Sequence, residues 1–197
     1  VLRHIDRGKY KIDFLVHTDQ PCAYDEEIRS LDSNIYPCLH PSNPLRYAYN
    51  FKKIVSSHGP FDVIHSHVHH FSGFVLRLAF NLHIPKRIAH SHSDLSAIQK
   101  ISPWYRRLYF WYMHRCIQKY ATIRLACSRL AANNLFGDRW DSDPRCRVLY
   151  CGIDLKPFKE FVDRKLVRDE LGIPSDALVI GHVGRFMEQK NHNLIID

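Results

Sequence analysis

The stretch FDVIHSHVHHFSGFVLRLAFNLHIPKRIAHSH, residues 61–92, contains two short apolar runs separated by one helix-length segment. The runs at 61–67 and 86–92 have the length and composition of buried strands, and residues 72–83 have the apolar spacing of a helix. A strand, a helix and a second strand in this order predict two parallel strands joined by a crossover helix.

The same alternation continues on both sides of this stretch. We expect further strands at 11–18, 122–128 and 147–152, and further helices at 44–57, 103–120 and 129–137. These repeated units predict an α/β fold, a Rossmann-like doubly wound parallel sheet with helices on both faces. Ligands of such sheets bind beyond the carboxyl ends of the strands, so functional residues are expected there.

The last part of the chain starts a new unit. Asp163 is placed to cap a short helix, and an apolar run at 177–183 predicts a fresh strand. We therefore divide the chain into an N-terminal, acceptor-side Rossmann-like domain at 1–160, a linker at 161–175, and the start of a truncated donor-binding domain at 176–197.

Composition limits the classes of protein that fit. The chain has 197 residues, of which 45% are hydrophobic and 24% charged, which is typical of a globular protein. No run approaches the ~18 apolar residues of a membrane span, and the first residues are too charged for a signal peptide. Six cysteines without a C-x-x-C pair favour a reducing cytoplasm, and the net charge of +8 suggests an anionic partner.

A loop with two cations follows the predicted strand at 177–183. Gly184 permits close backbone approach to a ligand, and Arg185 and Lys190 place two positive charges within the same loop. Such a loop suits a diphosphate, whose charge grows if a sugar–phosphate bond breaks there. An ordinary surface turn with two solvated cations is the alternative.

The run VIGHVGRFMEQKNHNLIID, residues 179–197, resembles the G-R-F-x-x-x-K-N-H segment of the retaining GT-B glycosyltransferases of family 4. Other segments resemble the same family in the same order along the chain: FDVIHSH, PKRIAHSHS, LACSRLAANNLFG and RVLYCGIDLKPF. The RIAHSHS and KNH segments are most similar to its exopolysaccharide and capsular branch. The resemblance covers about residues 61–197.

The resemblance implies a hexosyltransferase-type enzyme that moves a sugar from a nucleotide-diphosphate donor, with UDP expected, to a glycan or lipid-linked acceptor with retention. It implies that Gly184, Arg185, Lys190 and Asn191 bind the donor, and that His92 or His90 lies beside the transferred sugar. It implies no required cofactor and no metal. It also places the family's glycine-rich loop before Val1 and its paired glutamates after Asp197, so we expect a fragment that catalyses poorly by itself.

Histidines gather after the first two strands of the quoted stretch. His65 and His67 share a face at strand spacing, as do His90 and His92, and His69 and His70 follow closely. A zinc site, residues that line a binding cleft, and hydrogen-bonded structural histidines are three open interpretations of the 65–70 group. Cleft lining is favoured over zinc because no carboxylate or cysteine stands at ligand spacing.

The predicted helix at 103–120 has an unusual surface. Apolar residues at helical spacing predict a continuous core face: Tyr105, Leu108, Tyr109, Tyr112, Met113, Cys116, Ile117 and Tyr120. The other side mixes cations with aromatics: Arg106, Arg107, Phe110, Trp111, His114 and Arg115. This mixture suits contact with an anionic inner membrane leaflet, and packing against another element is the alternative.

Two other functions compete with glycosyl transfer. A GT-B sugar-nucleotide epimerase would share the fold and the donor loop. A non-catalytic basic module would bind anionic lipid or nucleic acid, although dispersed cations and the lack of a nucleic-acid-binding signature argue against nucleic acid.

Overall fold

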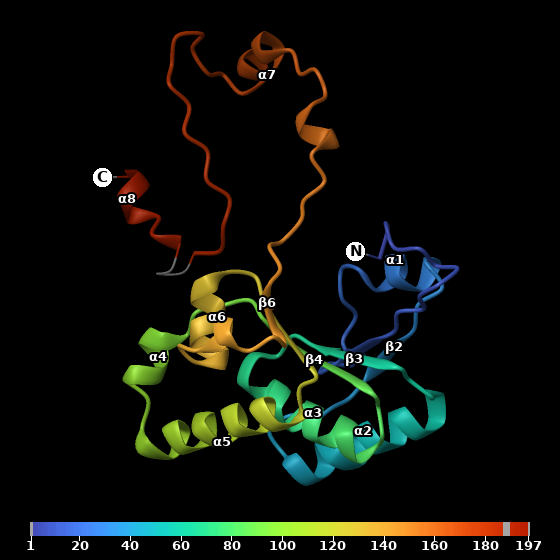
Figure 1. Cartoon of the computed structure of the whole chain (residues 1–197). Helices are drawn as coiled ribbons and strands as arrows, with labels where there is room; N and C mark the ends of the chain where they lie inside the picture. The colour runs from blue at the N-terminus through green and yellow to red at the C-terminus, as the bar shows by residue number, and fades with distance from the viewer. Residues whose placement is uncertain (1, 187–189, 197) are drawn as a thin grey trace. The chain divides into compact units, whose positions relative to one another are not determined.

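The computed structural model describes residues 2–186 and 190–196. It divides into two compact units, Val1–Cys151 and Gly152–Asp197 (Figure 1). The strands of the first unit are β1 (Phe14–Val16), β2 (Ile35–Pro37), β3 (Val63–Ser66), β4 (Lys86–Ser91), β5 (Ile123–Ala126) and β6 (Cys146–Val148). Its helices are α1 (Asp25–Ser30), α2 (Pro44–His58), η1 (His69–Phe71), α3 (Ser72–Asn81), α4 (Ser96–Lys100), α5 (Trp104–Tyr120), α6 (Arg129–Phe136) and η2 (Trp140–Ser142).

The strands form two parallel sheets. One has the order β1-β2 and the other the order β3-β4-β5-β6, and each pair of neighbours is parallel. The predicted α/β fold class with parallel strands is confirmed. The strands and helices predicted from the alternating pattern in this unit are all present, with ends displaced by a few residues.

Helices α3, α5 and α6 cover one face of the four-stranded sheet. The order β3-β4-β5-β6 follows the chain, so all three crossovers step in the same direction. Because parallel crossovers are right-handed, three steps in one direction place their helices on one face. Figure 1 shows α2, α3 and α5 on one side of the strands and α1 on the other.

The two faces of this sheet differ in burial. Strand register places Ala89, Ala126 and Cys146 on the helix-covered face, where they join the larger hydrophobic core with Leu76, Ile117 and Leu135. On the opposite face His90 is buried, and the other residues are half-buried or exposed: Val63, His65, Ile88, Ile123 and Leu125. Among the described elements, α3, α5 and α6 therefore cover one face of β3–β6.

The local sequence of α6 determines where this helix begins, where it ends and which residue it buries. The Ser128 hydroxyl accepts a hydrogen bond from the backbone N–H of Ala131 at 3.1 Å, and such a cap stabilises a helix by about 1 kcal/mol. Gly137 ends the helix with a φ of 88°, a conformation that favours glycine. The fully buried Leu135 contributes roughly 1.5–3 kcal/mol of apolar burial.

The predicted core face of α5 is wrong in its first half. Met113, Cys116 and Ile117 are buried, but four other residues of that face are exposed: Tyr105, Leu108, Tyr109 and Tyr112. Phe110, from the side predicted to be exposed, is instead half-buried, and its ring centroid lies 4.6 Å from that of His70 in η1. Helix α5 packs closely on α3. Gly73 of α3 permits this approach, since a Cβ there would overlap the carbonyl oxygen of Met113.

The second unit contains η3 (Lys156–Phe158), α7 (Arg164–Glu170) and α8 (Asn193–Ile196). The predicted cap of α7 is confirmed: the Asp163 side chain accepts from the backbone N–H groups of Lys165 and Leu166. The predicted strand at 177–183 is not formed. A strand requires a neighbour for its backbone hydrogen bonds, and within the described residues this unit contains no strand to pair with it.

Candidate functional site

Four histidines converge at the carboxyl ends of β3 and β4. His65 and His67 come from the end of β3, and His90 and His92 come from the end of β4, in two H-x-H sequences. Because side chains alternate along a strand, each pair projects from one face, and the strand register places both pairs on the face that α3, α5 and α6 do not cover. We call these four residues the histidine array.

The rings of the histidine array alternate between the strands. Ring centroids lie 5.2 Å apart for His65 and His90, 5.2 Å for His90 and His67, and 5.0 Å for His67 and His92. Hydrogen bonds join His65 Nε2 to His90 Nδ1 at 3.1 Å and His67 Nδ1 to His92 Nε2 at 2.7 Å. His90 is buried, whereas His92 and His67 are exposed and accessible to a ligand.

Three histidines of the array, His65, His67 and His90, have pKa values below the ordinary value and are uncharged at neutral pH. Burial and, to a smaller extent, the neighbouring imidazoles lower the pKa of His65 and of His90 to about 4. Burial also lowers the pKa of His67. Neutral imidazoles have a free lone pair, so these side chains can accept a proton or coordinate a metal ion.

The remaining two histidines of the 65–70 group have other partners. His69 contacts the carbonyl oxygen of Ser93 at 3.2 Å, and His70 contacts the Gln99 amide nitrogen at 2.6 Å. Burial lowers the pKa of His70 to about 3. The structure therefore brings four of the six predicted histidines together and assigns His69 and His70 to the packing of η1.

In the second unit, the loop that contains Gly184, Arg185, Lys190 and Asn191 has internal contacts among its described residues. The side chain of Lys190 lies against Gly184, where a Cβ would be 3.4 Å from the Lys190 Cγ. His192 Nε2 lies 3.0 Å from the carbonyl oxygen of Arg185, and Asn191 has a φ of 46°. Both cations stay exposed, so their charges are available to a ligand. Part of this loop, residues 187–189, lies outside the described residues.

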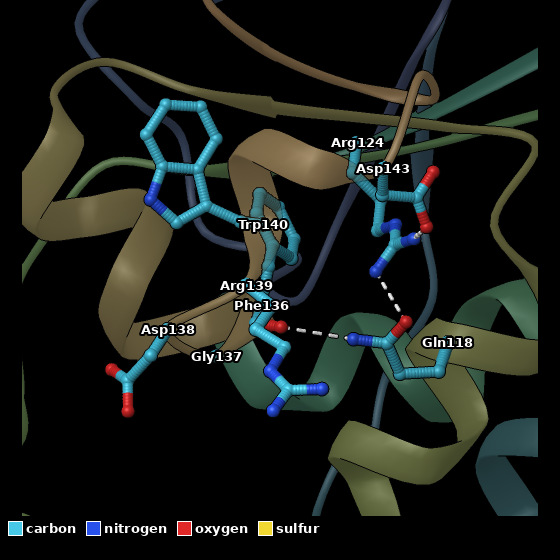
Figure 2. A pocket seen from close by; sticks show the side chains of 8 residues that line it. All are labelled: Gln118, Arg124, Phe136, Gly137, Asp138, Arg139, Trp140 and Asp143. Carbon is cyan, nitrogen blue, oxygen red and sulfur yellow. Dashed lines mark hydrogen bonds and ion pairs between the residues drawn. The ribbon is translucent and has the colours of Figure 1, made fainter.

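A second polar cluster, which the sequence analysis missed, lies near the amino ends of β5 and β6. Figure 2 shows Arg124 of β5 paired with Asp143 and with the side chain of Gln118 beside a cavity of about 360 Å³. Arg145 also bonds Asp143, at 2.8 Å, and hydrogen bonds from Arg145 hold the pKa of that carboxyl well below its usual range. Because two arginines already share the Asp143 carboxylate, we assign this cluster a structural role. Its only signal in the sequence is Arg124, an arginine inside an apolar strand.

The comparison with protein families identifies the chain. A model described as Glycosyltransferase Family 4 matches residues 1–157. The chain belongs to glycosyltransferase family 4. It is 36% identical over 200 residues to the Bacillus subtilis (strain 168) protein named "Putative glycosyltransferase EpsF", covering 98% of this chain and 51% of the relative. The chain thus spans about half the length of the curated relative that it matches.

Solved structures show the same fold. The chain resembles Anabaena HepE in complex with UDP, with a TM-score of 0.68 and 16% identity over 95% of this chain and 56% of HepE. HepE in complex with UDP and glucose gives a TM-score of 0.67 and the same identity over 94% of this chain. None of the helices described here is long and apolar enough to cross a membrane.

Proposed function

We propose that the full-length protein is a hexosyltransferase of exopolysaccharide synthesis. It transfers a hexosyl group from a UDP-sugar to a glycan or lipid-linked acceptor, with retention. Family membership and the relatedness to EpsF support the reaction class. The binding of UDP, and of UDP with glucose, by the structurally similar HepE supports the donor. The observation that carries the proposal for this chain is the histidine array on the accessible face at the carboxyl strand ends.

In this proposal His92 contacts the transferred sugar or the acceptor. It is the exposed member of the two candidate histidines, whereas His90 is the buried member of the array. The hydrogen bond from His67 fixes the ring of His92, so one orientation is favoured before substrate arrives. An imidazole whose Nε2 accepts from His67 carries its proton on Nδ1, so it can donate a hydrogen bond to the sugar or to the acceptor hydroxyl and orient it.

Arg185 and Lys190 bind the donor diphosphate. The two exposed cations lie in one loop with Gly184, which has no side chain of its own to obstruct a phosphate. As the sugar–phosphate bond breaks, negative charge grows on the departing diphosphate, and fixed cations stabilise that state more than the ground state. Asn191 belongs to the same loop and offers amide donors to the same phosphates.

The test is sugar transfer by the full-length protein with Lys190→Ala. We expect kcat/KM to fall about 10²–10³-fold, because one charge that stabilises the leaving group is lost. The melting temperature should stay unchanged, since Lys190 is exposed. Lys159→Ala, an exposed lysine of the same unit outside the loop, is the matched control. Equal activity in the two variants would reject the donor role.

We also propose that α5 contacts an anionic membrane surface, with a revised set of residues. Phe110 is half-buried against His70, so it does not serve the contact predicted for it together with Arg106, Arg107 and Trp111. Trp104 and Trp111 are 76% and 57% exposed, and cations accompany them along the helix. Exposed tryptophan beside arginine suits the headgroup region of a bilayer.

Vesicles containing phosphatidylglycerol test this contact. Changing Trp104 and Trp111 to Ser should release the protein from the vesicles without lowering its stability. Tyr49→Ser, which removes an equally exposed aromatic from α2, should leave binding unchanged. Loss of vesicle binding in both variants, or in neither, would reject α5 as the contact.

A further inference from the structure

Three imidazoles of the histidine array have the spacing of metal ligands. One ring nitrogen from each of His65, His67 and His90 lies within 4.8 Å of the others. The His65 Nε2 and His90 Nδ1 atoms are already 3.1 Å apart. Two nitrogens on one tetrahedral zinc ion lie about 3.3 Å apart, since each Zn–N bond is about 2.0–2.1 Å. Small side-chain rotations therefore suffice to place one ion among the three rings.

A second observation points to a ligand at the same place. His90 is only 7% exposed, and its Nε2 atom is buried with no hydrogen-bond partner among the residues that the structure describes. An imidazole nitrogen buried without a partner costs free energy that a ligand would recover. One ion binds a single nitrogen of a ring, so coordination through Nε2 of His90 would satisfy this atom, whereas coordination through Nδ1 would replace the hydrogen bond with His65.

The surroundings fix the three side chains. His65 and His90 lie within paired parallel strands, and sites built on strands hold their geometry better than sites on loops. His92 bonds Nδ1 of His67 at 2.7 Å, which orients that ring and leaves its other nitrogen available. An outer hydrogen bond of this kind is the usual support of a histidine that coordinates a metal.

We propose that His65, His67 and His90 bind one divalent transition-metal ion on the uncovered face of the sheet, with His92 as the residue that orients His67. A set of three imidazoles without a carboxylate selects zinc, nickel or copper and discriminates against magnesium and calcium, which prefer oxygen ligands. The exposed sides of His65 and His67 leave a coordination position open to solvent. The site does not depend on the proposed transfer activity.

The experiment is calorimetric titration of Zn²⁺ into the 197-residue chain from which any purification tag has been removed. We expect binding of one ion per chain, and at least a tenfold weaker affinity in His67→Gln and in His90→Gln. His4→Gln removes an exposed histidine far from the array in sequence and should bind zinc as the unmodified chain does. Mg²⁺ should give no binding.

Thermal unfolding gives an independent readout. A ligand that binds only the folded state raises Tm in proportion to the logarithm of its concentration above Kd. Zinc should therefore raise the Tm of the unmodified chain and of His4→Gln, and should raise it much less in His67→Gln. Since His67 is exposed, that variant is expected to fold even if His90→Gln does not.

Two results would overturn the proposal. One is the absence of one-to-one zinc binding at concentrations up to about 1 mM, the weak end of measurable affinities. The other is equal zinc affinity in His67→Gln and the unmodified chain. In either case the array is a set of hydrogen-bonded imidazoles and no metal site.

Discussion

The two ends of the four-stranded parallel sheet differ in how their polar side chains are paired. At the amino end, Arg124 is fully buried and its charge is neutralised by Asp143. At the carboxyl end, the histidine array contains no ion pair among the described residues, and its rings bond only one another. The difference teaches how to separate structure from function in this fold: paired charges hold the strands, whereas neutral imidazoles that bond only to one another keep a second ring nitrogen available to a ligand.

The strongest challenge to this comparison removes the buried ion pair. Asp143→Asn leaves the Arg124 charge buried without a counter-ion, which should lower the free energy of unfolding by about 3–5 kcal/mol. Urea denaturation of the chain measures this loss. Asp141→Asn, an exposed aspartate two residues away, is the matched control and should change stability little. Similar small effects in both variants would mean that Arg124 is stabilised by other contacts.

Acid should remove part of the same stabilisation. Hydrogen bonds from Arg145 are the main cause that lowers the folded-state pKa of Asp143 below its unfolded value. A lowered pKa contributes stability that is present above the unfolded value near pH 4 and is lost as pH falls through the folded value. The stability difference between the unmodified chain and Asp143→Asn should therefore be constant from pH 7 to about 5 and shrink at lower pH, as denaturation at several pH values would show. A difference that grows on acidification would contradict this assignment.

A smaller effect is expected at the carboxyl end, where Ser128 caps α6. Ser128→Ala removes the acceptor for the Ala131 backbone N–H and should cost about 1 kcal/mol in the same urea experiment. Ser142→Ala, at an exposed serine that caps no helix described here, serves as the comparison. Loss of several kcal/mol in Ser128→Ala would show that this end also carries the fold.

The smallest effect on stability is expected within the histidine array. His92→Ala should change the free energy of unfolding by less than about 0.5 kcal/mol, as exposed positions usually do. In the full-length protein the same change should lower kcat by about 10²-fold if His92 orients the reacting groups. A stability loss comparable to that of Asp143→Asn would remove the distinction between the two ends.

Local patterns were sufficient to predict most elements of the first unit. Apolar periodicity located α2, α5 and β4, and Gly137 marked the end of α6. The H-x-H spacing also predicted that His90 and His92 share a face. These features depend on residues close together in the chain, so the sequence is enough to predict them.

What the sequence did not predict depends on distant partners. The apolar run at 177–183 satisfies every local criterion for a strand, yet no strand forms, because pairing needs a neighbouring strand. The core face of α5 is predicted wrongly in its first half, because burial there depends on the distant contact of Phe110 with His70, which no spacing within the helix marks. The pairing of Arg124 with Asp143 joins β5 to the segment before β6, and no spacing in the sequence marks it.

The covering of one face of the four-stranded sheet by α3, α5 and α6 also bears on how such a protein can diverge. Every second residue of β3, β4 and β5 packs on helices and is constrained by them, while the residues between face the array side. Mutations at those alternate positions change the chemistry offered to a ligand with little effect on the core. The fold thereby allows substrate preference to change during evolution while its helices and their packing stay the same.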